Sequence, residues 1–240
     1  MVDGLVNARD LGGLPLLAGG TTPQGVFFRS ENVDALTARG WDELFRLGIR
    51  TVADLRQTAE RERDQRPRPD WVVTAHVDLD GLENVDFWRD YAESGLWGTA
   101  AYFLPHLVAM PERAGAALEA VAQAGEGGVL FHCMSGRDRT GMVAMLLLSL
   151  VGVEPEAIVH DYLETVRRAD ALAAATGREN DEPVREAILA RRGSTTELAF
   201  RDALASVDLE ALLTSAGVSE GTERCLRTWR GSLALDDQTG

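Results

Sequence analysis

One strand-loop-helix passage constrains the fold of this chain more than any other stretch. The apolar residues 129–131 follow two glycines and predict a short buried strand, and the long apolar run after Thr140 predicts a buried helix. Residues 133–139 must then form the loop that joins them. A buried strand leading directly into a buried helix is typical of an α/β protein.

This loop has the composition of an anion-binding site. A helix N-terminus carries unpartnered N–H groups and partial positive charge, so amides from about residue 134 to 140 can surround one tetrahedral oxyanion. Gly136 permits the turn, and the same field favours the thiolate of Cys133 as a nucleophile. Arg139 is spaced to hold two anion oxygens with its planar guanidinium. The predicted substrate-binding residues are Met134, Ser135, Gly136, Arg137 and Thr140.

The run His-Cys-x-x-Gly-Arg-Asp-Arg-Thr-Gly over residues 132–141 resembles the signature of cysteine-dependent phosphatases, and more narrowly of their bacterial tyrosine and dual-specificity branch. Two further stretches are similar to that family: residues 7–13 with Arg29-Ser30, and Asp-Leu-Arg at residues 54–56. The resemblance implies hydrolysis of phosphomonoesters through a cysteinyl-phosphate, without cofactor or metal. The implied substrates are phosphotyrosine proteins, with phosphoserine, phosphothreonine or phosphoinositides as extensions.

The proton donor for the leaving group is less obvious. These phosphatases usually carry an aspartate on a separate upstream loop, but no aspartate occurs between Asp90 and Cys133. The resemblance points instead to Asp138, with Asp54 as the second candidate; Asp54 is alternatively a structural partner of an arginine. Family members usually have lysine where this chain has Arg137, and either cation can bind a second phosphate near the site.

Three other residues have competing interpretations. His132 points to the opposite face from Cys133 on an extended strand, so it is either a group that fixes the loop through the backbone or a buried core histidine. Arg9 is expected to form a structural pair with Asp10 that ties down the N-terminal segment, with direct contact to the substrate as the alternative. Cys225 is expected to be a small buried residue rather than a redox partner.

Two alternatives to a phosphatase remain open. A rhodanese-like sulfurtransferase also has a cysteine loop near a helix, although the Arg-Thr-Gly ending favours phosphate. A phosphate-binding module without turnover would not need both Cys133 and Asp138. A structural cysteine is disfavoured, because two neighbouring arginines would be costly to bury without an anion.

Charge and hydropathy limit the partners. The net charge of −14 argues against nucleic acid as a partner, and the longest apolar stretch, residues 142–151, is too short to span a bilayer. No basic segment followed by an apolar run opens the chain, so a cytoplasmic location is expected, with secretion without a recognisable signal peptide as the alternative. The oligomeric state is left open.

The expected fold is α/β, with a central, mostly parallel twisted sheet of four to five strands flanked by helices, as in the cysteine phosphatases. We expect a single domain over residues 1–240. Within it we expect a lid-like helical insertion at about 81–110, C-terminal helices over 182–230 and a flexible tail over 231–240.

Overall fold

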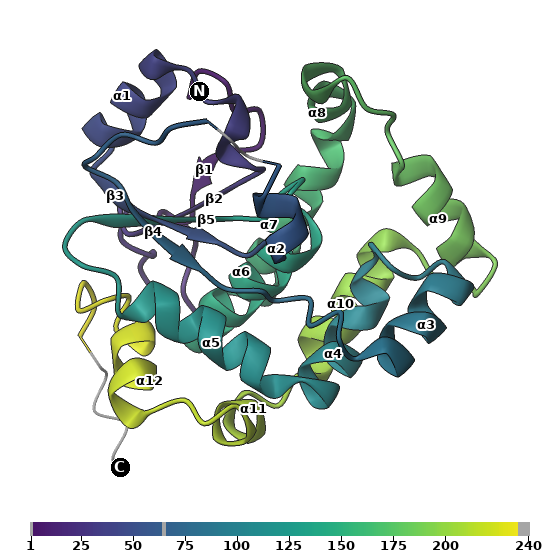
Figure 1. The fold of residues 1–240 in the computed structure, drawn as a ribbon. Helices are drawn as coiled ribbons and strands as arrows, with labels where there is room; N and C mark the ends of the chain where they lie inside the picture. Colours follow the sequence, from purple (N-terminus) through teal and green to yellow (C-terminus); the bar gives the residue numbers. More distant parts are fainter. Residues whose placement is uncertain (1, 64–65, 235–240) are drawn as a thin grey trace, which may run out of the picture.

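Within residues 2–63 and 66–234, which this computed structural model describes, five strands form one sheet in the order β1-β2-β5-β3-β4 (Figure 1). Strands β2, β5, β3 and β4 run parallel, and β1 pairs antiparallel with β2. The mostly parallel sheet expected from the sequence is confirmed. The strands are β1 (Arg9–Asp10), β2 (Phe27–Ser30), β3 (Ile49–Asp54), β4 (Val73–His76) and β5 (Gly128–His132).

Strand β5 lies at the centre of the sheet, as its composition requires. Val129, Leu130 and Phe131 are almost completely buried, because both faces of β5 are covered. The register places His132 between Ser30 of β2 and Asp54 of β3. The loop that follows therefore starts at the carboxyl edge of the sheet, where sites of open α/β folds form.

Helices cover both faces of the sheet (Figure 1). The α-helices are α1 (Ala38–Arg46), α2 (Thr58–Arg61), α3 (Val85–Ser94), α4 (Phe103–Ala109), α5 (Pro111–Ala122), α6 (Asp138–Leu150), α7 (Pro155–Arg167), α8 (Ala169–Thr176), α9 (Glu182–Ala190), α10 (Thr196–Ser206), α11 (Leu209–Ser215) and α12 (Glu220–Arg227). Two short 3-10 helices are η1 (Val33–Ala35) and η2 (Ala100–Tyr102).

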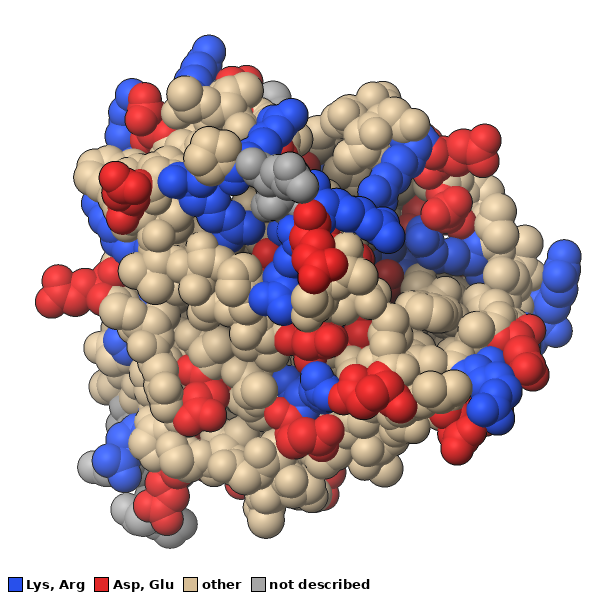
Figure 2. Space-filling view, viewed as in Figure 1, with Lys and Arg blue, Asp and Glu red and all other residues tan. Residues whose placement is uncertain are grey.

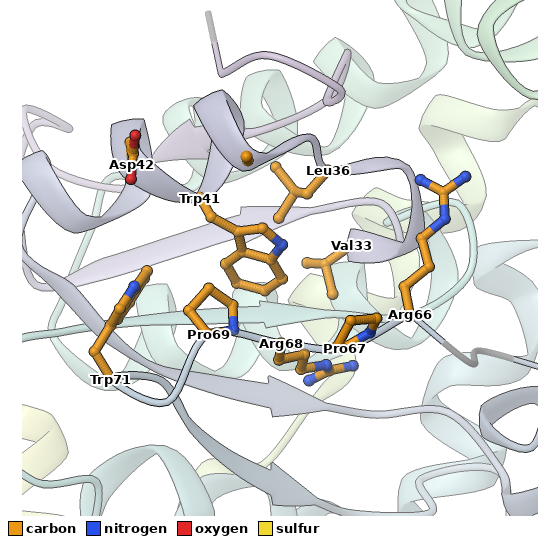
Figure 3. Close-up of a pocket in the computed structure, with 10 residues that line it drawn as sticks. Val33, Leu36, Trp41, Asp42, Arg66, Pro67, Arg68, Pro69 and Trp71 are labelled. Atoms are coloured by element: carbon orange, nitrogen blue, oxygen red, sulfur yellow. The ribbon is translucent and has the colours of Figure 1, made fainter.

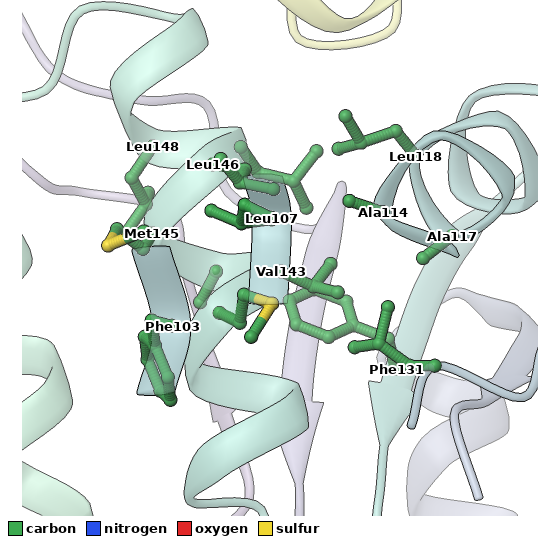
Figure 4. Close-up of a cluster of buried hydrophobic side chains, with 14 of the residues drawn as sticks. Phe103, Leu107, Ala114, Ala117, Leu118, Phe131, Val143, Met145, Leu146 and Leu148 are labelled. Carbon is green, nitrogen blue, oxygen red and sulfur yellow. The ribbon is translucent and has the colours of Figure 1, made fainter. Parts of the chain in front are cut away.

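Helix α6 forms the centre of the larger hydrophobic core, as the apolar run after Thr140 predicts. Val143 and Leu146 are each 1% exposed, and they pack in one cluster with Phe131 of β5, Leu107 of α4 and Ala117 of α5 (Figure 4). A helix that is apolar on nearly all sides is stable only when neighbours surround it. This burial fixes the first turn of α6, and with it the end of the preceding loop.

A smaller core lies on the face covered by α1. Trp41 and Leu44 of that helix pack against Val52 of β3 and Leu130 of β5. Helix α1 begins after Thr37, whose hydroxyl accepts a hydrogen bond of 3.1 Å from the amide of Gly40.

The predicted lid interval, 81–110, folds into α3, η2 and α4. Its aromatic rings cluster around Trp88, whose ring centroid lies 4.9 Å from that of Trp97 and 5.4 Å from that of Tyr102. Gly98 in this interval contacts the loop that precedes α6. That the interval moves as a lid stays a prediction.

The C-terminal part is helical over α9 to α12. Helix α10 begins after Thr195, whose hydroxyl accepts a hydrogen bond of 3.1 Å from the amide of Leu198. The predicted tail lies mostly outside the described residues, at 235–240. Among the described residues, no helix has the length and apolar character needed to cross a bilayer.

Candidate active site

The cysteine loop, residues 133–139, joins the end of β5 to the first turn of α6. Cys133 is 2% exposed and lies at its start. Gly136 has a φ of +70°, and a Cβ atom there would approach the carbonyl oxygen of Ser30 to 2.4 Å. Only glycine fits this position, so the turn predicted from the sequence is set both by backbone conformation and by contact with β2.

The amides of the cysteine loop are available to a ligand. No backbone N–H group of residues 134–140 donates a hydrogen bond to any other group in the part of the chain that the structure describes. The next amide, that of Gly141, donates to the carbonyl of Arg137 at 2.9 Å and begins the regular pattern of α6. Consecutive unpaired amides at a helix N-terminus form a binding site for a tetrahedral anion.

Arg139 turns back over the cysteine loop, and two carboxylates hold its guanidinium. Its two terminal nitrogens lie 2.5 and 2.9 Å from the two carboxylate oxygens of Glu60 on α2. The first of these nitrogens is also 2.9 Å from Oδ2 of Asp80. The bidentate geometry that suits a phosphate is therefore occupied by Glu60 in this arrangement.

Arg137 is buried, and its two terminal nitrogens donate to three neighbouring groups. It donates to the carbonyl of Gly98 at 2.5 Å, to Asp138 at 2.7 Å and to Glu182 of α9 at 2.9 Å. Its side chain is only 2% exposed. The side chain joins the cysteine loop to the 81–110 interval and to α9, and its donors are not directed at a second phosphate.

His132 and Asp54 lie beneath the loop rather than within it. His132 Nδ1 is 3.0 Å from the carbonyl of Cys133, and burial lowers the pKa of this histidine to about 4, which keeps it neutral. Asp54 forms two bonds of 2.9 and 2.8 Å with Arg56. Although burial alone would raise its pKa, the hydrogen bonds from Arg56 lower the pKa of Asp54 to about 2. Asp54 therefore lies where a structural partner of Arg56 is expected.

Asp80 is a site residue that the sequence analysis did not assign. It follows β4 at the same edge of the sheet, is 4% exposed and contacts Arg139. Burial is the main cause that raises the pKa of Asp80 to about 6; Arg139 opposes the shift, and the charges of Glu60, Asp78 and Asp138 add to it. The sequence shows Asp80 shortly after a predicted strand, but the contact between Asp80 and Arg139 depends on the order of the strands in the sheet.

A buried ionic network supports the cysteine loop from behind. Arg29 of β2 donates to the carbonyl of Gly136 at 2.6 Å and pairs with Asp161 of α7. Asp161 also accepts from Arg9 at 2.6 Å. The predicted pairing of Arg9 with Asp10 is therefore wrong: Asp10 instead accepts from two backbone amides of neighbouring turns, those of Gly12 and Gly25.

A cavity of about 300 Å³ opens beside the loop, between the loop and the α8–α9 region. Figure 2 shows this face of the molecule, where arginine and carboxylate side chains alternate around a hollow. The lining contains three arginines and four carboxylates, with apolar residues of α8 between them. The charged lining residues are Arg137, Arg178, Arg185, Glu60, Glu179, Asp181 and Glu182.

A second cavity, of about 520 Å³, lies between the η1–α1 region and the segment 66–71. Trp41, Trp71 and Pro69 dominate its wall (Figure 3). Cys133 and Arg139 do not line it, so it is not part of the site.

Known proteins with similar sequences are tyrosine phosphatases. A sequence profile described as "Tyrosine phosphatase family" matches residues 1–223. A protein described as a putative tyrosine-protein phosphatase in Cupriavidus necator is 33% identical over 172 residues, which are 69% of this chain and 62% of that protein. The triple specificity protein phosphatase PtpB of Mycobacterium tuberculosis is 33% identical over 168 residues, 59% of this chain and 61% of its own. The chain thus spans about three fifths of the length of these two relatives.

A solved structure of P. aeruginosa TpbA in complex with pTyr aligns with 16% identity and a TM-score of 0.36, covering 81% of this chain and 87% of that one. This likeness is too distant to support an argument, so the assignment depends on the sequence matches. Because the profile covers almost all of the described residues, including the whole cysteine loop, the chain belongs to the tyrosine phosphatase family.

Proposed function

We propose that this protein hydrolyses phosphotyrosine in proteins through a cysteinyl-phosphate intermediate. The observation that carries the proposal is the row of amides at residues 134–140, which donate to no group among the described residues. The row starts beside the buried Cys133 and ends at Arg139 and Thr140. This arrangement binds a tetrahedral dianion directly in front of a sulfur nucleophile. Phosphoryl transfer needs little more than such positioning and electrostatic stabilisation.

The reaction proceeds in two displacements. The Cys133 thiolate attacks phosphorus, the S–P bond forms, and the P–O bond to the tyrosine oxygen breaks as that oxygen takes a proton. Water then attacks phosphorus, the S–P bond breaks, and phosphate leaves. In both steps Arg139 and the loop amides hold the equatorial oxygens, and the field of the α6 N-terminus stabilises the thiolate both as nucleophile and as leaving group.

Substrate binding requires an exchange at Arg139. Because Glu60 occupies both terminal nitrogens of the guanidinium, the phosphate must displace the carboxylate to obtain the same two bonds. Asp80 can keep its hydrogen bond to Arg139 during this exchange, because it accepts from only one of the two terminal nitrogens.

The surroundings of the loop favour phosphotyrosine over polyphosphorylated lipids. Arg137 is committed to Asp138 and Glu182, and the neighbouring cavity contains one more carboxylate than arginines, so this cavity offers no excess positive charge to a second phosphate. The burial of Cys133 also favours a substrate whose phosphate stands at the end of an aromatic ring. Phosphoserine and phosphoinositides are therefore expected to be weaker substrates.

Phosphate release from matched phosphotyrosine and phosphoserine peptides and from phosphoinositide vesicles tests the proposal. We expect the phosphotyrosine peptide to be the best substrate and Cys133→Ser to abolish release, whereas Cys225→Ser, a change at the other free cysteine, leaves it intact. Binding of inorganic phosphate by a wild-type protein that releases none would favour the binding-module alternative. Transfer of sulfur from thiosulfate to cyanide would favour the sulfurtransferase.

A further inference from the structure

Behind the cysteine loop, the carbonyl groups of residues 134–136 each accept a hydrogen bond from a residue of another segment. The carbonyl of residue 134 accepts from the backbone amide of Asn32 at 3.0 Å and from its side chain at 3.3 Å. The carbonyl of residue 135 accepts from Nδ2 of Asn7 at 3.2 Å, and that of residue 136 accepts from Arg29 at 2.6 Å. None of these donors belongs to the loop itself.

These donors also set the directions of the loop amides. In a trans peptide the C=O of one residue and the N–H of the next point in opposite directions. A donor that holds a carbonyl on the outer side of the loop therefore turns the following N–H to the inner side, where the proposed phosphate site lies. By this relation Asn7 sets the direction of the Gly136 N–H, and Arg29 sets that of the Arg137 N–H.

The peptide between Ser135 and Gly136 has the greatest need of such a donor. Rotation of this peptide plane changes the φ of Gly136, which is +70°, and glycine adopts positive and negative φ about equally readily. Local backbone preference alone therefore leaves the plane free to rotate. Among the described residues, the side chain of Asn7 is the only donor to the Ser135 carbonyl, whereas the Met134 carbonyl has two donors.

Asn7 is itself held rigidly, with 0% of the residue exposed. Its amide donates to Glu31 at 2.9 Å, and its Oδ1 accepts from Arg9 at 2.6 Å and from the hydroxyl of Thr165 at 3.2 Å. Because an arginine side chain only donates, the atom of Asn7 that faces Arg9 must be the oxygen. The amide nitrogen, Nδ2, is then the atom that faces the Ser135 carbonyl.

Resting on the function proposed above, we propose that Asn7 is a positioning residue that holds the N–H of Gly136 toward the phosphate by fixing the Ser135–Gly136 peptide. Asn7 acts from behind the loop, through this peptide. Arg9 contributes indirectly, because it orients the side-chain amide of Asn7. The N-terminal segment is thus part of the phosphate site, which gives the Asn-x-Arg spacing of that segment a chemical reason.

Two matched asparagine-to-aspartate substitutions test the role of Asn7. Asn7→Asp keeps the oxygen that accepts from Arg9 and loses the donor to the Ser135 carbonyl, and the arginine keeps the new carboxyl group ionised. Asn32→Asp adds the same charge beside the preceding carbonyl and also removes a side-chain donor, but the backbone amide of residue 32 still holds that carbonyl. Asn32→Asp therefore measures the effect of the charge.

Calorimetric titration of inorganic phosphate gives the affinity of each variant. The loss of one hydrogen bond to a charged group corresponds to a change of about 10–100-fold in a dissociation constant. We expect the dissociation constant of Asn7→Asp to exceed that of Asn32→Asp by this factor. Asn7→Ala, which removes the donor without adding charge, should weaken binding to a similar extent relative to wild type.

NMR of isotope-labelled protein gives a readout for each amide. In wild type, phosphate should shift the amide resonances of both Ser135 and Gly136. In the Asn7 variants the Gly136 response should be lost while the Ser135 response remains, because Asn32 still orients the Ser135 N–H. A purely structural role of Asn7 would weaken the two responses alike.

Thr22→Val controls for lost stability in the same N-terminal segment. It removes a buried hydroxyl that donates to the carbonyl of Leu11 and accepts from the amide of Leu14. Since Thr22 does not contact the cysteine loop, this variant should unfold at a lower urea concentration than wild type and bind phosphate with unchanged affinity.

Each outcome has a distinct meaning. Equal phosphate affinities in Asn7→Asp and Asn32→Asp, or a Gly136 response that survives in the Asn7 variants, would overturn the role of Asn7 while leaving the phosphatase intact. If the Asn7 variants do not fold, wild type decides: phosphate that shifts the other loop amides but not that of Gly136 overturns the proposal. A wild-type protein that neither binds phosphate nor releases it from phosphotyrosine would instead overturn the proposed function.

Discussion

Replacing Glu60 by glutamine should strengthen phosphate binding, because Glu60 and the substrate compete for the same two nitrogens of Arg139. The carboxylate accepts at 2.5 and 2.9 Å, and the side chains of Arg139 and Glu60 are only 12% and 15% exposed. Although burial favours protonation, the bonds from Arg139 hold the pKa of Glu60 below its usual value, so the competitor is charged at neutral pH.

The size of the effect follows from the bonds that are exchanged. A hydrogen-bonded contact to a charged group contributes about 1.5–3 kcal/mol, and a neutral amide in the same place retains about 0.5–1.5 kcal/mol. The difference of about 1.5 kcal/mol corresponds to a roughly tenfold change in an equilibrium constant. Glu60→Gln should therefore lower the dissociation constant of inorganic phosphate about tenfold.

Calorimetric titration of phosphate into the Cys133→Ser background measures this constant without turnover. Glu62→Gln is the matched control, since Glu62 is exposed at the end of α2 and its replacement removes the same charge without affecting a hydrogen bond to Arg139. Equal affinities for Glu60→Gln and Glu62→Gln would refute the argument that Glu60 occupies the phosphate position.

Three further perturbations test the support of the site. Gly136→Ala should destabilise the fold by at least about 2 kcal/mol in urea unfolding, because the positive φ and the approach to Ser30 both oppose a side chain; a stable variant would contradict this. Asp161→Asn leaves the buried Arg29 and the partly buried Arg9 without their counter-charge and should cost about 3–5 kcal/mol, measured in the same way. Asp54 has a folded pKa of about 2 against 3.8 ordinarily, so the stability it contributes is complete at neutral pH and lost as the pH falls through this interval; Asp54→Asn should remove that part of the acid transition.

Local sequence was sufficient to predict the cysteine loop and its surroundings. The buried strand, the glycine at positive φ and the apolar helix are encoded within residues 128–150, so neighbouring residues determine them. The parallel sheet follows because strands alternate with helices along the chain. The start of α1 is also encoded locally, because its capping residue, Thr37, directly precedes it.

Long-range pairs were not predictable in this way. Arg9 was expected to pair with its neighbour Asp10, but its partner Asp161 lies on α7, and only the folded chain brings these residues together. Asp80 and Glu60 meet Arg139 because β3 lies beside β5 and β4 lies beside β3, an order that no local pattern states. The α8–α9 wall of the cavity was likewise missed, because its residues carry no motif.

The most direct test of the central claim is to trap the intermediate. Wild-type protein mixed with a phosphotyrosine peptide and quenched in acid within one turnover should carry phosphate on Cys133, located by mass spectrometry of its peptides, and Cys133→Ser should carry none. Phosphate on another residue, or release that persists in Cys133→Ser, would contradict the account.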